Sequence, residues 1–161
     1  MYVVGIIIGE DDMPRILKHT DYAARIVLYI AGLGPGAHIT ISEIISQRLM
    51  PGPFVRRVVA RLASTGILRT SRGSGGGVAL GRPPSKISMF DVIQAMEGNI
   101  ILNRCVTHPD DCPFSDECPV RQTWMVISEG LEKALQKVTF ESLLKKPLKP
   151  PAKTSRKPKE S

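Results

Sequence analysis

Three cysteines carry the most distinctive chemistry of the sequence, because all of them fall within one short stretch. Cys105, Cys112 and Cys118 lie in the segment CVTHPDDCPFSDEC, and the chain has no other cysteine. A single cysteine is usually buried as a small hydrophobic residue. This segment is rich in Asp and Pro and offers no apolar face that could bury three of them. The clustering predicts that the three thiolates converge on a metal centre.

The spacing of the cysteines leaves the kind of centre open. The pattern Cys-x6-Cys-x5-Cys lacks the Cys-x2-Cys pair that usually opens a structural zinc site or a dithiol redox motif. A secreted disulfide framework requires paired cysteines and an export signal, whereas this chain has an odd number of cysteines and no recognisable signal peptide. An iron–sulfur cluster accepts three thiolates and one weaker ligand. From spacing alone, a cluster is as well supported as zinc or plain thiols.

Positive charge is concentrated in two parts of the chain. Residues 53–82 contain no acidic residue and six arginines, namely Arg56, Arg57, Arg61, Arg69, Arg72 and Arg82. Residues 145–161 contain seven basic residues and one acidic residue, whereas the rest of the chain has nine basic against fourteen acidic residues. This distribution, within a net charge of +7, predicts a surface that binds a polyanion such as DNA. A solvated basic face is the simpler alternative.

The hydrophobic pattern of residues 13–84 predicts a helix-turn-helix. A helix over residues 20–33 is expected to start at Thr20 as its cap, and a Thr40–Glu43 capping box starts a second short helix. Pro53 then suits the first turn of a third helix. Its expected inward residues are Phe54, Val55, Val58, Val59 and Leu62, and its expected outward residues are Arg56, Arg57 and Arg61. The third helix is therefore the candidate for entering the DNA major groove.

Two short strands follow and add a wing. Residues 67–71 and 78–80 have strand patterns and flank a run of glycines that starts after Arg72. A phosphate-cradling loop is the alternative for this run, but it lacks the Gly-Lys-Ser/Thr ending of a P-loop and leads into a strand. We predict a mainly α winged helix-turn-helix with a small β-hairpin wing. Candidate base contacts are Arg56 and Arg57, and candidate phosphate contacts are Arg61, Arg69 and Arg72.

The C-terminal half is expected to provide a linking helix and a dimerisation helix. A Ser88–Asp91 capping box starts a helix within residues 85–104, and Pro119 follows the cysteine segment of residues 105–118. Residues 119–146 are expected to form a long helix and, over residues 139–144, a final short helical turn. Along the long helix apolar residues alternate steps of four and three, namely Val120, Trp124, Ile127, Leu131, Ala134 and Val138. This seam predicts a homodimer, although packing on the chain's own core would use the same period.

Both ends of the chain are expected to lie outside these units. Residues 1–12 are interpreted as an N-terminal extension or a misassigned start, because the helical pattern begins just behind Met13. Residues 147–161 are rich in Pro and Lys and are predicted to be a disordered basic tail. No stretch approaches the roughly 18 apolar residues of a membrane span, so we expect no membrane partner.

Several of these features together resemble a known family. They are the set Thr20-Asp21-Tyr22-Ala23, the run Leu68-x-x-Ser71-Arg72-Gly73-x-x-Gly76-Gly77-x-x-Leu80, the stretch Asp91-Val92-Ile93 with Glu97-Gly98, and the three-cysteine segment before a long helix. On these motifs, residues 13–146 resemble the bacterial winged-helix repressors that include IscR, NsrR and RirA. The resemblance implies a cytoplasmic homodimeric repressor that binds a pseudo-palindromic operator, with a DNA affinity that depends on an iron–sulfur cluster near the dimer interface.

The resemblance also implies a ligand set. IscR-like proteins use a histidine three residues after the last cysteine, where this sequence has Arg121. NsrR-like proteins take an aspartate from the first helix of the partner, and Asp21 occupies that place, although a carboxylate there also suits any helix start. The ligands implied for a 4Fe-4S cluster are Cys105, Cys112, Cys118 and Asp21, with His19, His108, Asp110 and Asp111 as other candidates for the fourth place. The first cysteine gap is one residue longer than in NsrR-like proteins, so a 2Fe-2S cluster is the alternative. Nitric oxide, redox state or iron status is the implied signal.

Two other classes of protein would use the same cysteines. An electron-transfer or thiol-redox enzyme is disfavoured, because the sequence has no Cys-x2-Cys pair and only three histidines for acid–base chemistry. A zinc-containing or cluster-free dimeric regulator would keep the DNA-binding half of the interpretation. We therefore expect a DNA-binding regulator that is not an enzyme.

Overall fold

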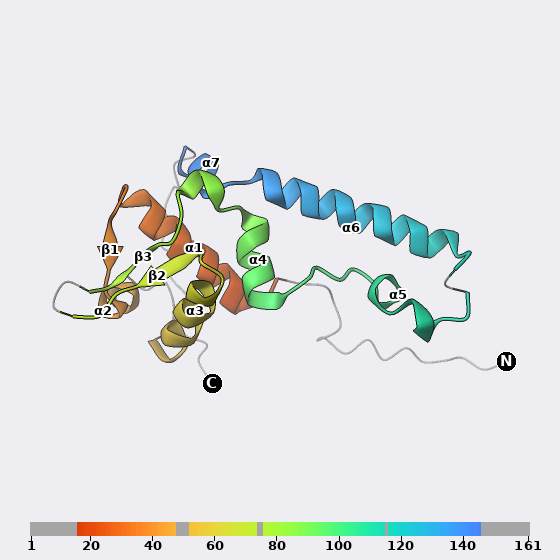
Figure 1. Cartoon of the computed structure of the whole chain (residues 1–161), viewed down its shortest axis with the longest axis horizontal. Coiled ribbons are helices and arrows are strands. Elements are labelled where there is room, and N and C mark those ends of the chain that lie inside the picture. Colours follow the sequence, from red (N-terminus) through yellow and green to blue (C-terminus); the bar gives the residue numbers. More distant parts are fainter. Residues whose placement is uncertain (1–15, 48–51, 74–75, 115, 146–161) are drawn as a thin grey trace, which may run out of the picture.

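A helical body and a projecting arm make up the computed structural model, which describes residues 16–47, 52–73, 76–114 and 116–145 (Figure 1). The helices of the body are α1 (Lys18–Gly32), α2 (Ile41–Ser46), α3 (Gly52–Ser64), α4 (Met89–Glu97) and α7 (Phe140–Leu144), with the 3-10 turn η1 (Pro84–Lys86). The arm consists of α5 (Arg104–Thr107), the 3-10 turn η2 (Pro109–Asp111) and α6 (Pro119–Lys137). The expectations for residues 1–12 and 147–161 lie outside the described residues.

The body carries a three-stranded antiparallel sheet in the order β1-β3-β2. The strands β2 (Leu68–Thr70) and β3 (Val78–Leu80) form the predicted hairpin, which is confirmed, with Arg69 opposite Ala79. The strand β1 (His38–Ile39) pairs with the other edge of β3 and was not predicted. Two residues are too few to show an alternating pattern, so this strand leaves no signal in the sequence.

Capping boxes fix the starts of two helices as predicted. At the start of α2 the Glu43 amide donates to Thr40 Oγ1 at 3.1 Å, and the Thr40 amide donates to Glu43 Oε2 at 2.6 Å. At the start of α4 the Asp91 amide donates to Ser88 Oγ at 3.2 Å, and the Ser88 amide donates to Asp91 Oδ2 at 2.7 Å. Each box satisfies two amide groups that the helix itself leaves unpaired.

The predicted cap at Thr20 is wrong. Helix α1 begins two residues earlier, with Leu17 at its N-cap position. The Leu17 amide donates to Glu97 Oε1 at 3.0 Å, so the side chain at the end of α4 satisfies the backbone where α1 starts. Thr20 lies inside the helix with 1% of its surface exposed. The tertiary contact with Glu97, which no local pattern shows, decides the helix boundary.

The core lies between α1, α3, the sheet, α4 and α7. Its largest fully buried side chains include Ile26, Ile30, Ile44, Leu62, Ile67 and Phe140. On α3 the inward prediction is confirmed for Val55, Val58, Val59 and Leu62. It is wrong for Phe54, which is 52% exposed. The four aliphatic residues fill the side of α3 that faces the core, and Phe54 falls outside their arc.

The chain returns from the arm to the body at its C-terminal end. The Met89 amide donates to the Val138 carbonyl at 2.8 Å, and the Phe140 amide donates to the Ile87 carbonyl at 2.9 Å. The Phe140 ring is fully buried in the core. The C-terminal end of α6 is therefore tied to the body, whereas its N-terminal end lies at the far end of the arm (Figure 1). No described helix has the length and apolar character needed to cross a membrane.

Candidate nucleic-acid interface and metal centre

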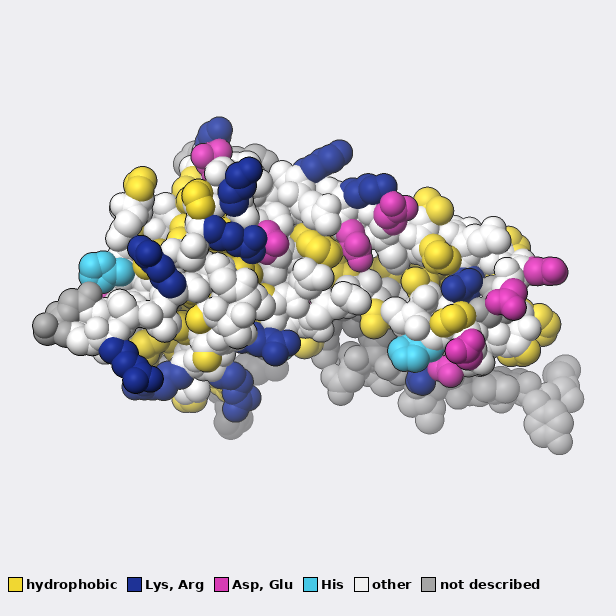
Figure 2. Space-filling view, viewed as in Figure 1, with side chains coloured by type: hydrophobic (Ala, Val, Ile, Leu, Met, Phe, Trp, Pro, Cys, Tyr) yellow, Lys and Arg dark blue, Asp and Glu magenta, His cyan; other side chains and the backbone are white. Residues whose placement is uncertain are grey.

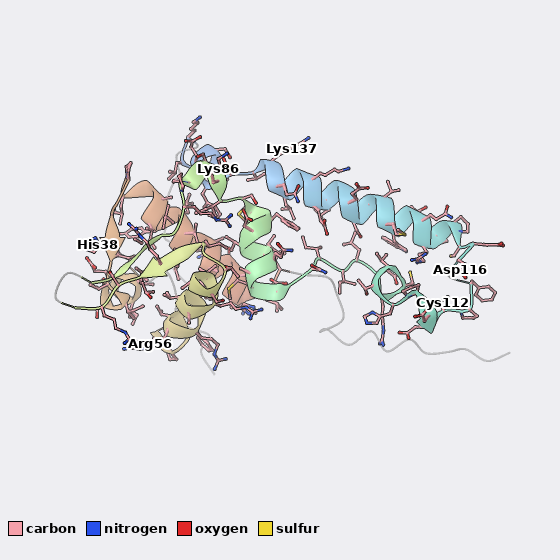
Figure 3. All side chains as sticks on the ribbon, viewed as in Figure 1. His38, Arg56, Lys86, Cys112, Asp116 and Lys137 are labelled. Atoms are coloured by element: carbon pink, nitrogen blue, oxygen red, sulfur yellow. The ribbon has the colours of Figure 1, made fainter. Side chains whose placement is uncertain are left out.

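The helix α3 presents basic side chains at the outer edge of the body. Arg56 and Arg57 are exposed, and the first turn of α3 contains no acidic residue. Arg56 points away from the body (Figure 3). The amide groups at the start of a helix add positive partial charge next to these side chains. This end of α3 is therefore suited to approach DNA.

Arg61 has a structural contact besides its exposed surface. Its Nε donates to the Ala95 carbonyl at 2.7 Å and so ties α3 to the last turns of α4. Arg61 lies on the same side of α3 as Phe54, Arg57 and Val58, all of which line one pocket. The assignment of Arg61 to a phosphate stays a prediction, and its Nε is already used within the body.

The wing is closed at its base by backbone hydrogen bonds. The Ser71 amide donates to the Gly77 carbonyl at 2.9 Å, and the Gly77 amide donates to Ser71 Oγ at 3.1 Å. Arg72 follows this closure and is exposed, as is Arg69 on β2. Both arginines are thus exposed on the hairpin, and their assignment to phosphates stays a prediction.

The two ends of the molecule differ in charge. Figure 2 shows Lys and Arg side chains over much of the body, whereas Asp and Glu side chains predominate toward the free end of the arm. On this face the body is better suited than the arm tip to approach a polyanion, because phosphates repel carboxylates.

The cysteine loop is held in shape by hydrogen bonds at the free end of the arm. The three cysteines are free and partly buried. The Cys105 amide donates to Asn103 Oδ1 at 3.2 Å, and Arg104 Nε lies 3.0 Å from Asp111 Oδ2. Arg121 Nε donates to the Cys105 carbonyl at 2.9 Å, which links the loop to α6. The residue in the place of the IscR-like histidine thus positions the first cysteine.

A body with a winged helix-turn-helix and an arm with a cysteine loop limit the families to which this chain can belong. A comparison of its sequence with family models identifies the family. Residues 16–146 match the family model Rrf2, described as iron-dependent transcriptional regulators. The chain belongs to the Rrf2 family. Protein aau3 of Rhizobium meliloti (strain 1021) is 31% identical over 132 residues, covering 81% of this chain and 85% of that protein. The regulator NsrR of Bacillus subtilis (strain 168) is 27% identical over 135 residues, covering 81% of this chain and 90% of that protein.

Solved structures share the fold of this Rrf2 protein. CymR (YrzC), the global cysteine regulator of B. subtilis, aligns with a TM-score of 0.66 at 23% identity over 83% of this chain and 98% of that one. IscR of T. potens aligns with a TM-score of 0.62 at 21% identity over 81% of this chain and 86% of that one. The predicted fold is confirmed. As an Rrf2 protein the chain is a DNA-binding transcriptional regulator, and regulators of this family bind DNA as dimers.

A single Rrf2 chain does not gather the predicted metal ligands. Among the described residues, no three His, Cys, Asp or Glu side chains are placed together to hold a metal ion. Cys112 lies at the free end of the arm, whereas Asp21 is on α1 in the body (Figures 1 and 3). The donor types suit iron, because three free thiols and one exposed carboxylate are available. Within this chain, the described residues therefore do not bring Asp21 and the cysteines together.

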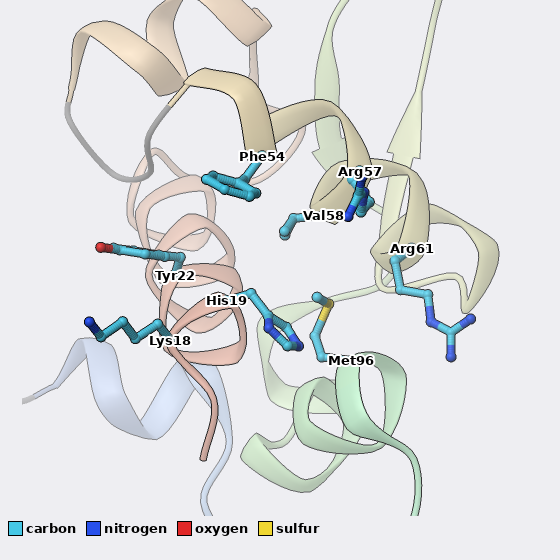
Figure 4. Close-up of a pocket in the computed structure, with 8 residues that line it drawn as sticks. All are labelled: Lys18, His19, Tyr22, Phe54, Arg57, Val58, Arg61 and Met96. Atoms are coloured by element: carbon cyan, nitrogen blue, oxygen red, sulfur yellow. The ribbon is translucent and has the colours of Figure 1, made fainter. Parts of the chain in front are cut away.

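The candidate ligands have other contacts within the chain. Asp21 Oδ2 lies 2.7 Å from Arg25 Nη2, one turn further along α1. His108 Nδ1 lies 2.9 Å from Thr107 Oγ1, and Asp111 pairs with Arg104. His19 lies in the body beside Met96 (Figure 4). The exposed ion pair of Asp21 with Arg25 holds the carboxylate only weakly, so another partner can compete for it.

The seam of α6 is largely uncovered in the single Rrf2 chain. Val120 is 61%, Ile127 46% and Leu131 36% exposed. An apolar stripe of this extent is typical of a surface that another chain covers. Packing on the chain's own body, the alternative from sequence, is present where α6 contacts α4, but it leaves Val120, Ile127 and Leu131 exposed to the extent given above.

Sequence reasoning missed two features of this region. One is the pocket beside Phe54, which forms only when α1, α3 and α4 pack together and so could not be predicted from local patterns. The other is the contact of Arg121 with the Cys105 carbonyl, for which the only signal was an arginine where related proteins have a ligand.

Proposed function

We propose that this Rrf2 protein is a homodimeric repressor and that an iron–sulfur cluster bound through Cys105, Cys112 and Cys118 controls its affinity for DNA. The observation that carries the proposal is the grouping of three free, partly buried thiols in one loop of the arm, away from the core. The description of the family as iron-dependent and the similarity to NsrR of B. subtilis support it.

The fourth ligand in this proposal is Asp21 of the partner chain. Its carboxylate is exposed on the first turn of α1 and is paired only with the exposed Arg25 within its own chain. Bound there, a 4Fe-4S cluster would supply a link between the two chains that is sensitive to nitric oxide, redox state and iron supply. A 2Fe-2S cluster remains the alternative within the same proposal.

The packing of α1 explains how the loop can influence DNA binding. Helix α1 contacts both α3 and α4, and its N-cap residue Leu17 donates a backbone hydrogen bond to Glu97 at the end of α4. A loop that holds Asp21 of the partner restrains α1 and, through it, the orientation of α3. Two restrained α3 helices keep the spacing that a pseudo-palindromic operator requires. Arg56 and Arg57 then read bases, while residues further along α3 and on the wing hold phosphates.

A binding experiment tests the regulatory part of the proposal. Duplexes bound by the oxygen-free protein are selected from a random pool, and affinity is then measured by fluorescence anisotropy before and after nitric oxide. We expect affinity to fall, and Cys112→Ser to bind as the treated wild type does. Equal affinity in all three samples would refute control by the loop. Glu129→Gln, at an exposed carboxylate of α6, is the control and should respond like wild type.

Mixed dimers test whether Asp21 acts across the interface. One chain carries Asp21→Ala and the other carries Cys112→Ser, so each parent homodimer lacks a complete site. If Asp21 serves the partner, the mixed dimer has one intact site and binds iron and sulfide at half the wild-type amount. If Asp21 serves its own chain, the mixed dimer has none.

A cluster-free thiol regulator is the second candidate. Its support is that the thiols are free and that the described residues form no metal site within one chain. The fold is also shared with the cysteine regulator CymR, including an oxidised form from Staphylococcus aureus with a TM-score of 0.63. Loss of DNA binding on mild oxidation of iron-free protein, reversed by a thiol reductant, would favour this candidate over the cluster. Stoichiometric zinc in colourless protein would favour a structural metal instead.

A further inference from the structure

A pocket lies between α1, α3 and α4 of the body (Figure 4). Its volume is about 720 Å3, and Tyr22, Phe54, Val58 and Met96 supply most of its apolar lining. Phe54 is 52% exposed there. Concave apolar sites of this size are usually filled by a ligand or by a side chain of a partner.

The charges around the pocket restrict what can occupy it. Lys18, Arg57 and Arg61 lie among the lining residues, and none of the lining residues is acidic. The basic side chains come from α1 and α3, on either side of the apolar floor. A fitting occupant therefore combines an apolar group with negative charge.

The tip of the cysteine loop has this combination. Phe114 is 75% exposed, more than any other large hydrophobic residue that the structure describes. The loop between Cys105 and Cys118 contains no Lys or Arg and four acidic residues, namely Asp110, Asp111, Asp116 and Glu117. Phe114 is thus an aromatic side chain within an acidic segment.

The geometry of the arm indicates which loop can reach the pocket. Helix α6 has 19 residues, so it extends about 28 Å and carries the chain's own loop away from its own body (Figure 1). Its other end is anchored to the body through Val138 and Phe140. If two α6 seams pair in antiparallel fashion about a two-fold axis, the free end of each arm meets the body of the other chain. The loop of a second copy is therefore the occupant within reach.

We infer that Phe114 of one chain docks into this pocket of a second copy. The inference rests on the proposed function, in which the same loop takes Asp21 from that copy. Asp21 is on the helical turn between Lys18 and Tyr22, which line the pocket. Phe114 is two residues from Cys112, so it can lie within about 7 Å of the ligand position. Docking brings the loop against α3 and gives the state of the thiols a direct route to Arg57.

Photo-crosslinking tests the docking on the full-length protein. The photoreactive amino acid p-benzoylphenylalanine replaces Phe114, and isotope-labelled and unlabelled chains are mixed before irradiation. We expect crosslinks between the two chains, mapped by mass spectrometry to residues 18–22 or 54–61. The matched control places the same amino acid at Val126, which is 70% exposed on α6 and does not line the pocket. It should not react with those residues.

The outcomes separate this inference from the proposed function. Iron and sulfide are counted in the same samples. A dimer that contains iron and sulfide but shows no crosslinks to these residues, or crosslinks only to other surfaces, refutes the docking and leaves the proposal of a cluster intact. Crosslinks to these residues in a dimer that never binds iron support the docking and refute the proposal of an iron–sulfur cluster.

A double-mutant cycle supplies a second readout. Phe114→Ala and Phe54→Ala should each raise the dimer dissociation constant about tenfold or more, because each dimer buries two such rings. The double variant should be little weaker than either single variant. Additive effects would contradict direct contact between the two sites.

Discussion

Arg72 gives the sharpest test of the DNA-binding surface, because its predicted contact with a phosphate implies a definite change in how DNA affinity depends on salt concentration. Arg72 is exposed next to the closed base of the wing and is assigned to a phosphate. Arg72→Ala removes one phosphate contact per chain and two per dimer. Each contact contributes about 0.9 to the slope of log affinity against log salt, so the slope should become shallower by about 1.8. Between about 50 and 200 mM salt, the ratio of wild-type to variant affinity should change by about 12-fold.

The assay is fluorescence anisotropy with one fixed duplex at several salt concentrations. Arg82→Ala is the matched control, because it removes the same charge from the same basic segment. Arg82 Nη2 lies 3.4 Å from Asp91 Oδ1 and belongs to the body rather than the wing. For Arg82→Ala, the slope of log affinity against log salt should equal the wild-type value. Urea denaturation confirms that this variant is folded. The reasoning is refuted if Arg72→Ala leaves the slope unchanged or if Arg82→Ala changes it equally.

Three further predictions concern the fold and the loop. Phe140→Ala should lower the free energy of unfolding by about 3 to 5 kcal/mol in urea denaturation, because the ring is fully buried where the chain returns to the body; a loss below about 1 kcal/mol would contradict this. Hydrogen bonds from the Thr40 amide and, second, from the Thr40 hydroxyl hold the pKa of Glu43 below the usual value of a glutamate. The ionised Glu43 side chain should therefore stabilise the fold fully at a pH above the usual glutamate pKa. This stabilisation should be lost as the pH falls through the lowered pKa. Urea midpoints of wild type and Glu43→Gln should therefore differ near neutral pH and converge in acid; a constant difference would count against the capping box. Arg121→Met removes the hydrogen bond to the Cys105 carbonyl, so amide exchange in α5 should accelerate about tenfold, and unchanged exchange would show that the loop keeps its shape without Arg121.

Local patterns predicted most helices and the hairpin, because short-range chemistry determines them. The capping boxes at Thr40 and Ser88 each join residues three positions apart, and both are present. Gly66 and Gly98 follow the ends of α3 and α4 with φ values of 72° and 86°, a backbone region that glycine adopts readily. Such features depend on a few adjacent residues and can be read without a tertiary structure.

Features that depend on contacts distant in sequence were not predictable. Helix α1 starts at Lys18 because Glu97 accepts from the Leu17 amide across a separation of 80 residues. Phe54 was expected inward because it is apolar, but the arc of α3 that faces the core is already filled. A final short helical turn was expected around Phe140, but the burial of its ring depends on the pairing of this segment with Ile87, which is distant in sequence.

The candidate metal site was predicted in composition but not in geometry. The sequence indicates which residues have metal-binding chemistry, and the cysteines do share one loop. The position of Asp21 relative to that loop depends on how two chains pair, which neither composition nor periodicity encodes. Arg121, in the place of the histidine that the resemblance implies for IscR-like proteins, donates a hydrogen bond to the Cys105 carbonyl.

Native mass spectrometry of oxygen-free protein shows whether a cluster is shared between two chains, because mass reports chain number and cluster composition together. The account predicts a dimer that carries up to one four-iron, four-sulfide cluster per chain. It also predicts that Asp21→Ala loses the cluster readily, whereas Asp116→Ala, at an exposed carboxylate of the loop that is not a candidate ligand, retains it. A dimer that carries zinc or no metal would contradict the account, and a cluster indifferent to Asp21 would contradict the ligand shared between chains.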